Sequence, residues 1–126
     1  MPRREIIVRL EDMRKAAIGL QTMMDEIKTE ENFLASLAYK MAFERSFEII
    51  GEALYHIRKE RPEVMVTHMN KIIGLRHIIA HDYYEINHEI LWEVAENKLM
   101  TLYGEVLKLI DTENIRLFGT SSPEID

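Results

Sequence analysis

The sequence contains no cysteine, and this absence removes whole classes of structure. Without thiols the chain has neither disulfide bonds nor thiolate metal sites, which fits a reducing compartment. No apolar run approaches the ~20 residues that a membrane span requires, and the first residues do not form the apolar block of a signal peptide. We therefore expect a cytoplasmic protein that makes no contact with a membrane.

Basic residues are also scarce, because 16 Lys and Arg stand against 22 Asp and Glu and the net charge is −6. This balance excludes a protein whose whole surface binds nucleic acid, since phosphate binding depends on clustered Lys and Arg. Any nucleic-acid contact must therefore be local. With 126 residues, a hydrophobic fraction of 47% and only three prolines, the chain is expected to form one globular domain.

The sequence shows no strand pattern, because no stretch alternates polar and apolar residues at period two for long enough. It also shows no internal repeat and no glycine-rich phosphate loop. Apolar residues instead recur at spacings of three and four, which is typical of helices. Caps and breakers such as Thr29, Pro62, Thr67 and Asn87 divide this pattern into helices over residues 6–27, from the interruption at 29–32 to 61, over 68–81 and over 87–109.

These helices predict an all-α fold, an antiparallel bundle of four main helices joined by short connections. The predicted domain covers residues 1–111, and residues 112–126 are predicted to be a polar, loose tail. Gly51 lies inside the second helix, where glycine costs about 1 kcal/mol relative to alanine. Either another backbone passes close to Gly51, or the glycine is simply tolerated.

Chemistry-bearing side chains are most concentrated in residues 74–84, which hold one cation, two imidazoles, one carboxylate and two phenols. Arginine suits phosphate oxygens, and histidine exchanges protons near neutral pH. Arg76 and His81 together describe metal-independent cleavage of RNA, in which His81 moves a proton and Arg76 stabilises the charge on the phosphate. The products would carry a cyclic phosphate and a free 5′-hydroxyl.

The spacing of Arg76 and His81 raises a geometric question, because five residues place them ~140° apart around an unbroken helix. Three solutions are open. The helix could loosen near Ala80, the two side chains could enter a groove from different sides, or a second copy of the chain could complete the site.

Several neighbouring residues are candidates for supporting roles. His77 and His81 share a helix face near Asp82, which resembles a metal site but lacks a third ligand at a suitable spacing, so we expect neither a metal nor a cofactor. His77 and Asp82 are interpreted as support. Glu48 and Glu52 either orient Arg76 or are solvated. The remaining histidines have no partner at an informative spacing and are interpreted as surface residues: His56, His68 and His88.

The pattern of Arg76, His81 and Tyr83 reproduces the Arg-x4-His-x-Tyr signature and resembles the HepT-like toxins of the HEPN superfamily. The segments 47–53, 72–76 and 90–94 also look like that family, and the resemblance covers residues 4–111. It implies a HEPN-like helical fold and a homodimer with the active-site cleft at its interface. It further implies a ribonuclease toxin that cleaves mRNA or tRNA, with Arg76 and His81 as catalytic residues.

The resemblance also implies a regulatory partner, a nucleotidyltransferase antitoxin that silences the toxin by AMPylation of the motif tyrosine, here Tyr83. An AMP group two residues from His81 would block the groove and place a phosphate opposite Arg76. Tyr84 offers a second phenol next door, although the motif spacing favours Tyr83. The alternative function is a non-catalytic nucleotide- or RNA-binding subunit of a nucleotidyltransferase, in which Arg76 serves as a phosphate clamp.

Overall fold

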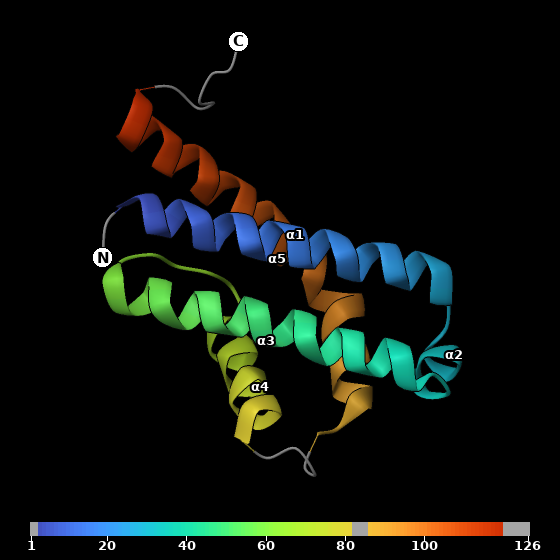
Figure 1. The fold of residues 1–126 in the computed structure, drawn as a ribbon. Helices are drawn as coiled ribbons and strands as arrows, with labels where there is room; N and C mark the ends of the chain where they lie inside the picture. The colour runs from blue at the N-terminus through green and yellow to red at the C-terminus, as the bar shows by residue number, and fades with distance from the viewer. Residues whose placement is uncertain (1–2, 82–85, 120–126) are drawn as a thin grey trace.

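The computed structural model describes residues 3–81 and 86–119, and the regular structure within these ranges is entirely helical. The elements are shown in Figure 1, and they are α1 (Arg3–Ile27), α2 (Glu30–Leu34), α3 (Leu37–Glu60), α4 (Met69–His81) and α5 (His88–Phe118). The predicted all-α class is therefore confirmed. Four of the helices are long, and α2 is a single short turn of helix between two of them.

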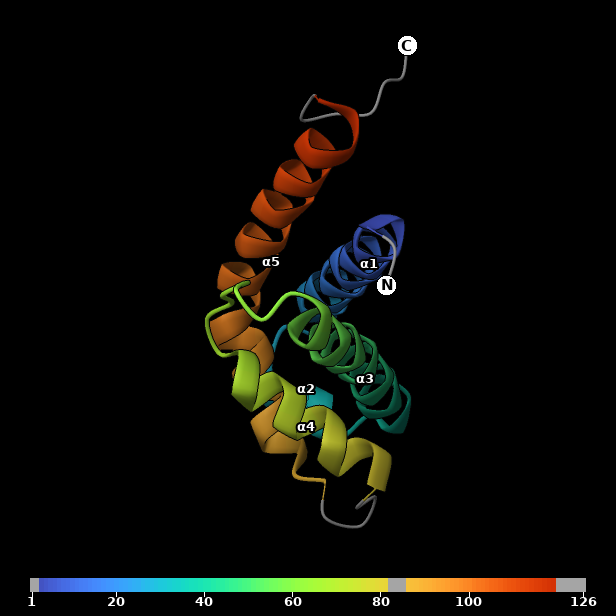
Figure 2. The same ribbon diagram turned by 90° about the vertical axis from the view of Figure 1, so that its left-hand side faces the viewer.

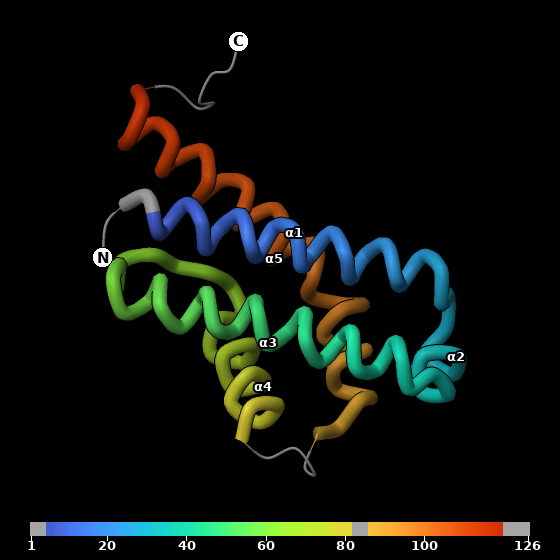
Figure 3. The backbone as a smooth tube through the Cα atoms, viewed as in Figure 1, coloured from blue at the N-terminus to red at the C-terminus, as the bar shows by residue number. Residues whose placement is uncertain are grey.

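Helices α1 and α3 lie side by side and run in opposite directions (Figure 1). Helix α5 packs against α1, and α4 packs against the opposite side of α3, as the rotated view in Figure 2 shows. Among the described helices α4 contacts only α3. In the tube of Figure 3 the end of α4 and the first turns of α5 lie at the same end of the molecule. Helix α4 is thus an outer helix, held from one side.

The core is built by the residues whose spacing predicted the helices. On α1 the buried positions recur every three or four residues, and they include Leu10, Met13 and Leu20, each almost completely inaccessible. Phe33, Phe43 and Trp92 bring α2, α3 and α5 together, with ring centroids 4.4 Å apart for the two phenylalanines. Burying each such side chain contributes about 2–3 kcal/mol. The aromatic cluster therefore fixes the end of the bundle from which α5 starts.

The predicted second helix corresponds to α3, and the structure adds a short separate helix, α2, before it. Thr29 does cap a helix, because its hydroxyl accepts a hydrogen bond from the Asn32 amide, but α2 ends at Leu34. Ser36 then caps a new helix by accepting a hydrogen bond from the Tyr39 amide at 3.1 Å. A serine at this position offers the backbone an alternative to helical hydrogen bonding, which explains the break. Helix α3 ends at Glu60, before Pro62, as predicted.

Thr67 was predicted to cap the third helix, and the structure corrects this. Its backbone amide and its hydroxyl both donate to the Glu105 carboxylate on α5, the hydroxyl at 2.7 Å. Helix α4 begins two residues later, at Met69, after His68 has adopted a positive φ of 64°. Thr67 therefore ties the connector between α3 and α4 to α5.

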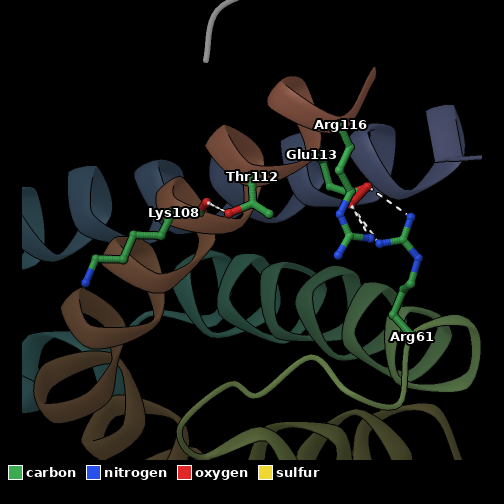
Figure 4. A network of polar contacts seen from close by, with 5 residues as sticks. All are labelled: Arg61, Lys108, Thr112, Glu113 and Arg116. Atoms are coloured by element: carbon green, nitrogen blue, oxygen red, sulfur yellow. Dashed lines mark hydrogen bonds and ion pairs between the residues drawn. The ribbon is translucent and has the colours of Figure 1, made fainter. Parts of the chain in front are cut away.

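Helix α5 starts as predicted, because the Asn87 side chain accepts a hydrogen bond from the Glu89 amide at 3.0 Å. It continues to Phe118, so the boundary predicted at residue 111 lies inside a helix. Glu113 explains the extension, since it is buried and pairs with Arg61 at 2.7 Å and 3.1 Å (Figure 4). The last turns of α5 are thereby held to the end of α3.

The described helices are also informative about membranes. None of those in residues 3–81 and 86–119 is long and apolar enough to cross a bilayer.

Candidate functional site

Gly51 is where α4 approaches α3 most closely. A Cβ atom placed on Gly51 would overlap the Arg76 Cβ and would lie 3.1 Å from the Ile72 carbonyl oxygen. No side chain fits there, so α4 can lie against the α3 backbone only because residue 51 is glycine. The predicted close approach of another backbone at Gly51 is confirmed, and the segment that approaches carries the motif arginine.

Glu52 lies next to this contact and pairs with Arg76. The Arg76 Nη2 donates to Glu52 Oε1, and the side chain of Arg76 is 24% exposed. The other carboxylate oxygen, Oε2, lies 2.9 Å from His56 Nε2. Of the two alternatives for Glu52, the structure therefore selects orientation of Arg76. Glu48 behaves differently, because it pairs with Arg45 on its own helix at 3.2 Å.

The cations around Glu52 also set its protonation state. Burial by itself raises the pKa of Glu52, but the hydrogen bond to His56 and the charge and hydrogen bond of Arg76 act in the opposite direction and bring this pKa below its ordinary value. Glu52 is consequently a carboxylate at neutral pH. It accepts hydrogen bonds from both neighbours and donates none.

Tyr55 completes the surroundings of Arg76. Its ring lies under the guanidinium, with the Arg76 Cζ 5.6 Å from the ring centroid, and its edge faces the His56 ring at 5.3 Å. The Lys59 ammonium lies 5.2 Å from the same centroid. Cations favour the face of an aromatic ring, so Tyr55 restricts where the Arg76 guanidinium can turn.

Arg76 nevertheless retains hydrogen-bonding capacity. Its Nε atom is buried and has no partner within the part of the chain that the structure describes. A guanidinium presents five N–H donors, and Glu52 engages only the Nη2 side. The buried Nε does not face solvent, so it is the Nη1 donors that suit an anion such as a phosphate.

His81 lies at the last residue of α4 and is exposed, as is His77 one turn earlier. Their ring centroids are 4.8 Å apart, so the predicted shared face is confirmed. Within the described ranges no three His, Asp or Glu side chains form a group that could hold a metal ion.

The helix that carries the motif is unbroken from Met69 to His81. The suggestion that it loosens near Ala80 is therefore wrong, and Arg76 and His81 point in directions ~140° apart. Arg76 turns toward α3, whereas His81 lies on the exposed side. Asp82 and Tyr83, and the neighbouring phenol Tyr84, lie outside the described residues.

Two histidines that the sequence placed on the surface have partners instead. His56 is bound to Glu52, and His88 is bound to Glu44 at 2.6 Å and packs edge-on to Phe33. The spacing of Glu52 and His56, four residues on one helix, is the signal that could have revealed the first pair. No sequence signal links His88 to Glu44, which is 44 residues away.

The family model of HepT-like ribonucleases matches residues 5–109, which include the whole of α4 and most of α5. A protein from Caldanaerobacter subterraneus subsp. tengcongensis is 32% identical over 84 residues, covering 66% of this chain and 75% of its own. Two proteins from Methanocaldococcus jannaschii are each 28% identical over 111 residues, covering 87% of this chain and 91% or 95% of their own. All three carry the name "Putative RNase". No solved structure matches the chain.

Proposed function

Because the chain belongs to the HepT-like ribonuclease family, we propose that it is a metal-independent endoribonuclease whose active site contains Arg76 and His81. The observation that carries the proposal is the way Arg76 is held. Gly51 admits its backbone, Glu52 pairs with it and Tyr55 lies beneath it, while its buried Nε has no protein partner. An oriented guanidinium with free donors stabilises the charge that develops on a phosphate during cleavage.

The reaction is an intramolecular transesterification at one phosphodiester of the RNA. The 2′-oxygen of the ribose bonds to phosphorus as the bond to the 5′-oxygen breaks, which leaves a cyclic phosphate and a 5′-hydroxyl. Arg76 binds the non-bridging oxygens, and His81 transfers a proton. The substrate class that we propose is mRNA or tRNA, bound locally, because the acidic surface of the chain does not favour extended contact with RNA.

We also propose that the site is shared between two copies of the chain. Arg76 and His81 point in different directions on an unbroken α4, and no other described helix packs on the outer side of α4. A two-fold axis beside that face would bring the His81 of one copy toward the Arg76 of the other.

The enzyme would act as the toxin of a toxin–antitoxin pair whose antitoxin is a nucleotidyltransferase. Transfer of AMP from ATP to the Tyr83 oxygen, with release of pyrophosphate and the phenolic proton, would place a bulky anion two residues from His81 and exclude RNA. The test is co-expression with such an enzyme followed by mass spectrometry. One added AMP that disappears in Tyr83→Phe supports the proposal, and modification of Tyr84 or no modification contradicts it.

The experiment that tests the nuclease is cleavage of RNA by purified protein in excess EDTA. The wild type should leave cyclic phosphate ends, and Arg76→Ala and His81→Ala should each lower the rate by about 10²–10⁴-fold. Arg14→Ala is the matched control, since Arg14 pairs with Glu11 on α1, away from α4. Cleavage that needs added metal would overturn the mechanism. An inactive wild type that still binds nucleotide or RNA would favour the non-catalytic subunit.

A further inference from the structure

One carboxylate joins two different functional groups beside the proposed catalytic site. Glu52 Oε1 accepts from Arg76, and Glu52 Oε2 lies 2.9 Å from His56 Nε2. Both partners therefore lie beside a single anionic group, on the surface where α4 meets α3. The Glu52 carboxylate therefore holds the His56 ring and the Arg76 guanidinium on its two oxygens.

The proposed reaction requires a second proton-transfer group besides His81. One proton must leave the 2′-hydroxyl as its oxygen attacks phosphorus, and another must reach the 5′-oxygen as it departs. One histidine cannot accept and donate at the same moment, and an arginine does not give up its proton. If His81 performs one transfer, a second group performs the other, and His56 is the titratable side chain that shares the carboxylate of Arg76.

We propose that His56 is the general base of this reaction and that His81 is the general acid. The inference rests on the proposed ribonuclease function. The Glu52 carboxylate accepts the proton on His56 Nε2, which leaves Nδ1 with an available lone pair. Within the described residues Nδ1 has no hydrogen-bond partner, and the side chain is 33% exposed.

Both proton transfers of the reaction then have a residue assigned to them. His56 Nδ1 takes the proton of the 2′-hydroxyl as the bond from the 2′-oxygen to phosphorus forms. His81 gives its proton to the 5′-oxygen as the bond from phosphorus to that oxygen breaks. Arg76 holds the phosphate oxygens throughout, and Glu52 stabilises the imidazolium that forms on His56.

The charges around the Glu52 carboxylate come from three helices. His56 lies on the same helix, α3, and Arg76 comes from α4. Arg9 and Asp12 come from α1 and line the groove that extends to Glu52. The lowered pKa of Glu52 keeps its carboxylate ionised over the range in which histidine titrates, so the tie to His56 persists through neutral pH.

A hydrogen bond between a histidine and a carboxylate does not by itself make a catalytic pair. The pair of His88 and Glu44 shows the difference. His88 lies 2.6 Å from Glu44, and it is 25% exposed. That pair holds the start of α5 to α3, and Glu44 has no arginine or lysine partner among the described residues. What distinguishes His56 is that its carboxylate also holds the motif arginine.

The test compares two versions of a short oligoribonucleotide that spans the main cleavage site of the wild type. In one, the scissile 5′-oxygen is retained, and in the other it is replaced by sulfur, which departs without a proton. We expect His81→Ala to lose about 10²–10⁴-fold with oxygen and to recover most of its rate with sulfur. His56→Asn should be slow with both substrates and should lose the acidic limb of the pH–rate profile. His68→Asn is the control, an exposed histidine on the connector before α4.

Each outcome separates this inference from the proposed function. If the wild type and Arg76→Ala are equally inactive, the ribonuclease function itself is wrong. If Arg76→Ala is slow but His56→Asn cleaves at the wild-type rate with an unchanged pH profile, only the role of His56 is refuted. Recovery of His56→Asn by the sulfur substrate would also refute its assignment as the base. Circular dichroism and thermal melting of each variant establish that it is folded.

Discussion

At the scale of single residues, the position of Arg76 depends on an atom that Gly51 lacks. The Arg76 Cβ occupies the space in which a side chain at residue 51 would begin, and the Ile72 carbonyl oxygen closes the same space from the α4 backbone. The glycine weakens α3 by about 1 kcal/mol relative to alanine. Because residue 51 has no side chain, α4 lies close enough for Arg76 to reach both Glu52 and the Tyr55 ring.

We predict that Gly51→Ala separates α4 from α3. The overlap should lower the free energy of unfolding by about 1–3 kcal/mol, measured by urea denaturation. Displacement of Arg76 should reduce RNA cleavage roughly tenfold or more. Gly104→Ala is the matched control, because its Cβ meets nothing within 4 Å, and it should stabilise α5 by about 0.5–1 kcal/mol. Equal effects of the two substitutions would contradict the proposed role of Gly51.

At the scale of secondary structure elements, the end of α3 is fastened to α5 by a buried ion pair (Figure 4). Arg61 Nη1 and Nη2 donate to the two carboxylate oxygens of Glu113. The side chain of Arg61 is 16% exposed and that of Glu113 is 5% exposed. The hydrogen bond to Glu113, partly opposed by burial, raises the pKa of Arg61. Removing Glu113 would leave the largely buried Arg61 cation without its hydrogen-bonded carboxylate.

We predict that Glu113→Ala lowers the free energy of unfolding by about 3–5 kcal/mol, because Arg61 loses its partner in a buried site. The double variant Arg61→Met/Glu113→Leu should recover most of that loss, since neither of the two buried charges remains, and Arg116, the other partner of Glu113, is 46% exposed. As a control, Glu11→Ala breaks the exposed pair with Arg14 and should cost less than about 1 kcal/mol. Urea denaturation measures all three, and a Glu113→Ala effect no larger than that of Glu11→Ala would refute the role of this pair.

At the scale of the whole molecule, a single copy of α4 presents the two motif residues on different sides. Arg76 is committed to α3, and His81 stands on the exposed side with His77. Whether the site is built within one chain or between two therefore depends on what binds at the open face of α4.

We predict that a mixture of Arg76→Ala and His81→Ala chains, each inactive alone, regains activity. In a mixed dimer one site receives Arg76 from one copy and His81 from the other, so random mixing restores about a quarter of the wild-type rate. Sedimentation analysis should show the dimer directly. If the mixture stays inactive although mixed dimers form, Arg76 and His81 act within one chain.

The sequence by itself determined the helical class, most helix ends and the motif. Apolar spacing defines a helix because burial repeats with the helical period. Caps act through a side-chain oxygen that accepts from a nearby backbone amide, and proline acts through its ring and its missing N–H, so both signals are local. The sequence also suggested that another backbone passes close to Gly51, because glycine is unfavourable inside a helix. The tertiary structure alone decided that α4 is the neighbour at Gly51 and that Glu52, not Glu48, pairs with Arg76. It alone decided that α5 continues to Phe118, held by Arg61. These outcomes depend on contacts between residues far apart in the chain, which local periodicity does not encode.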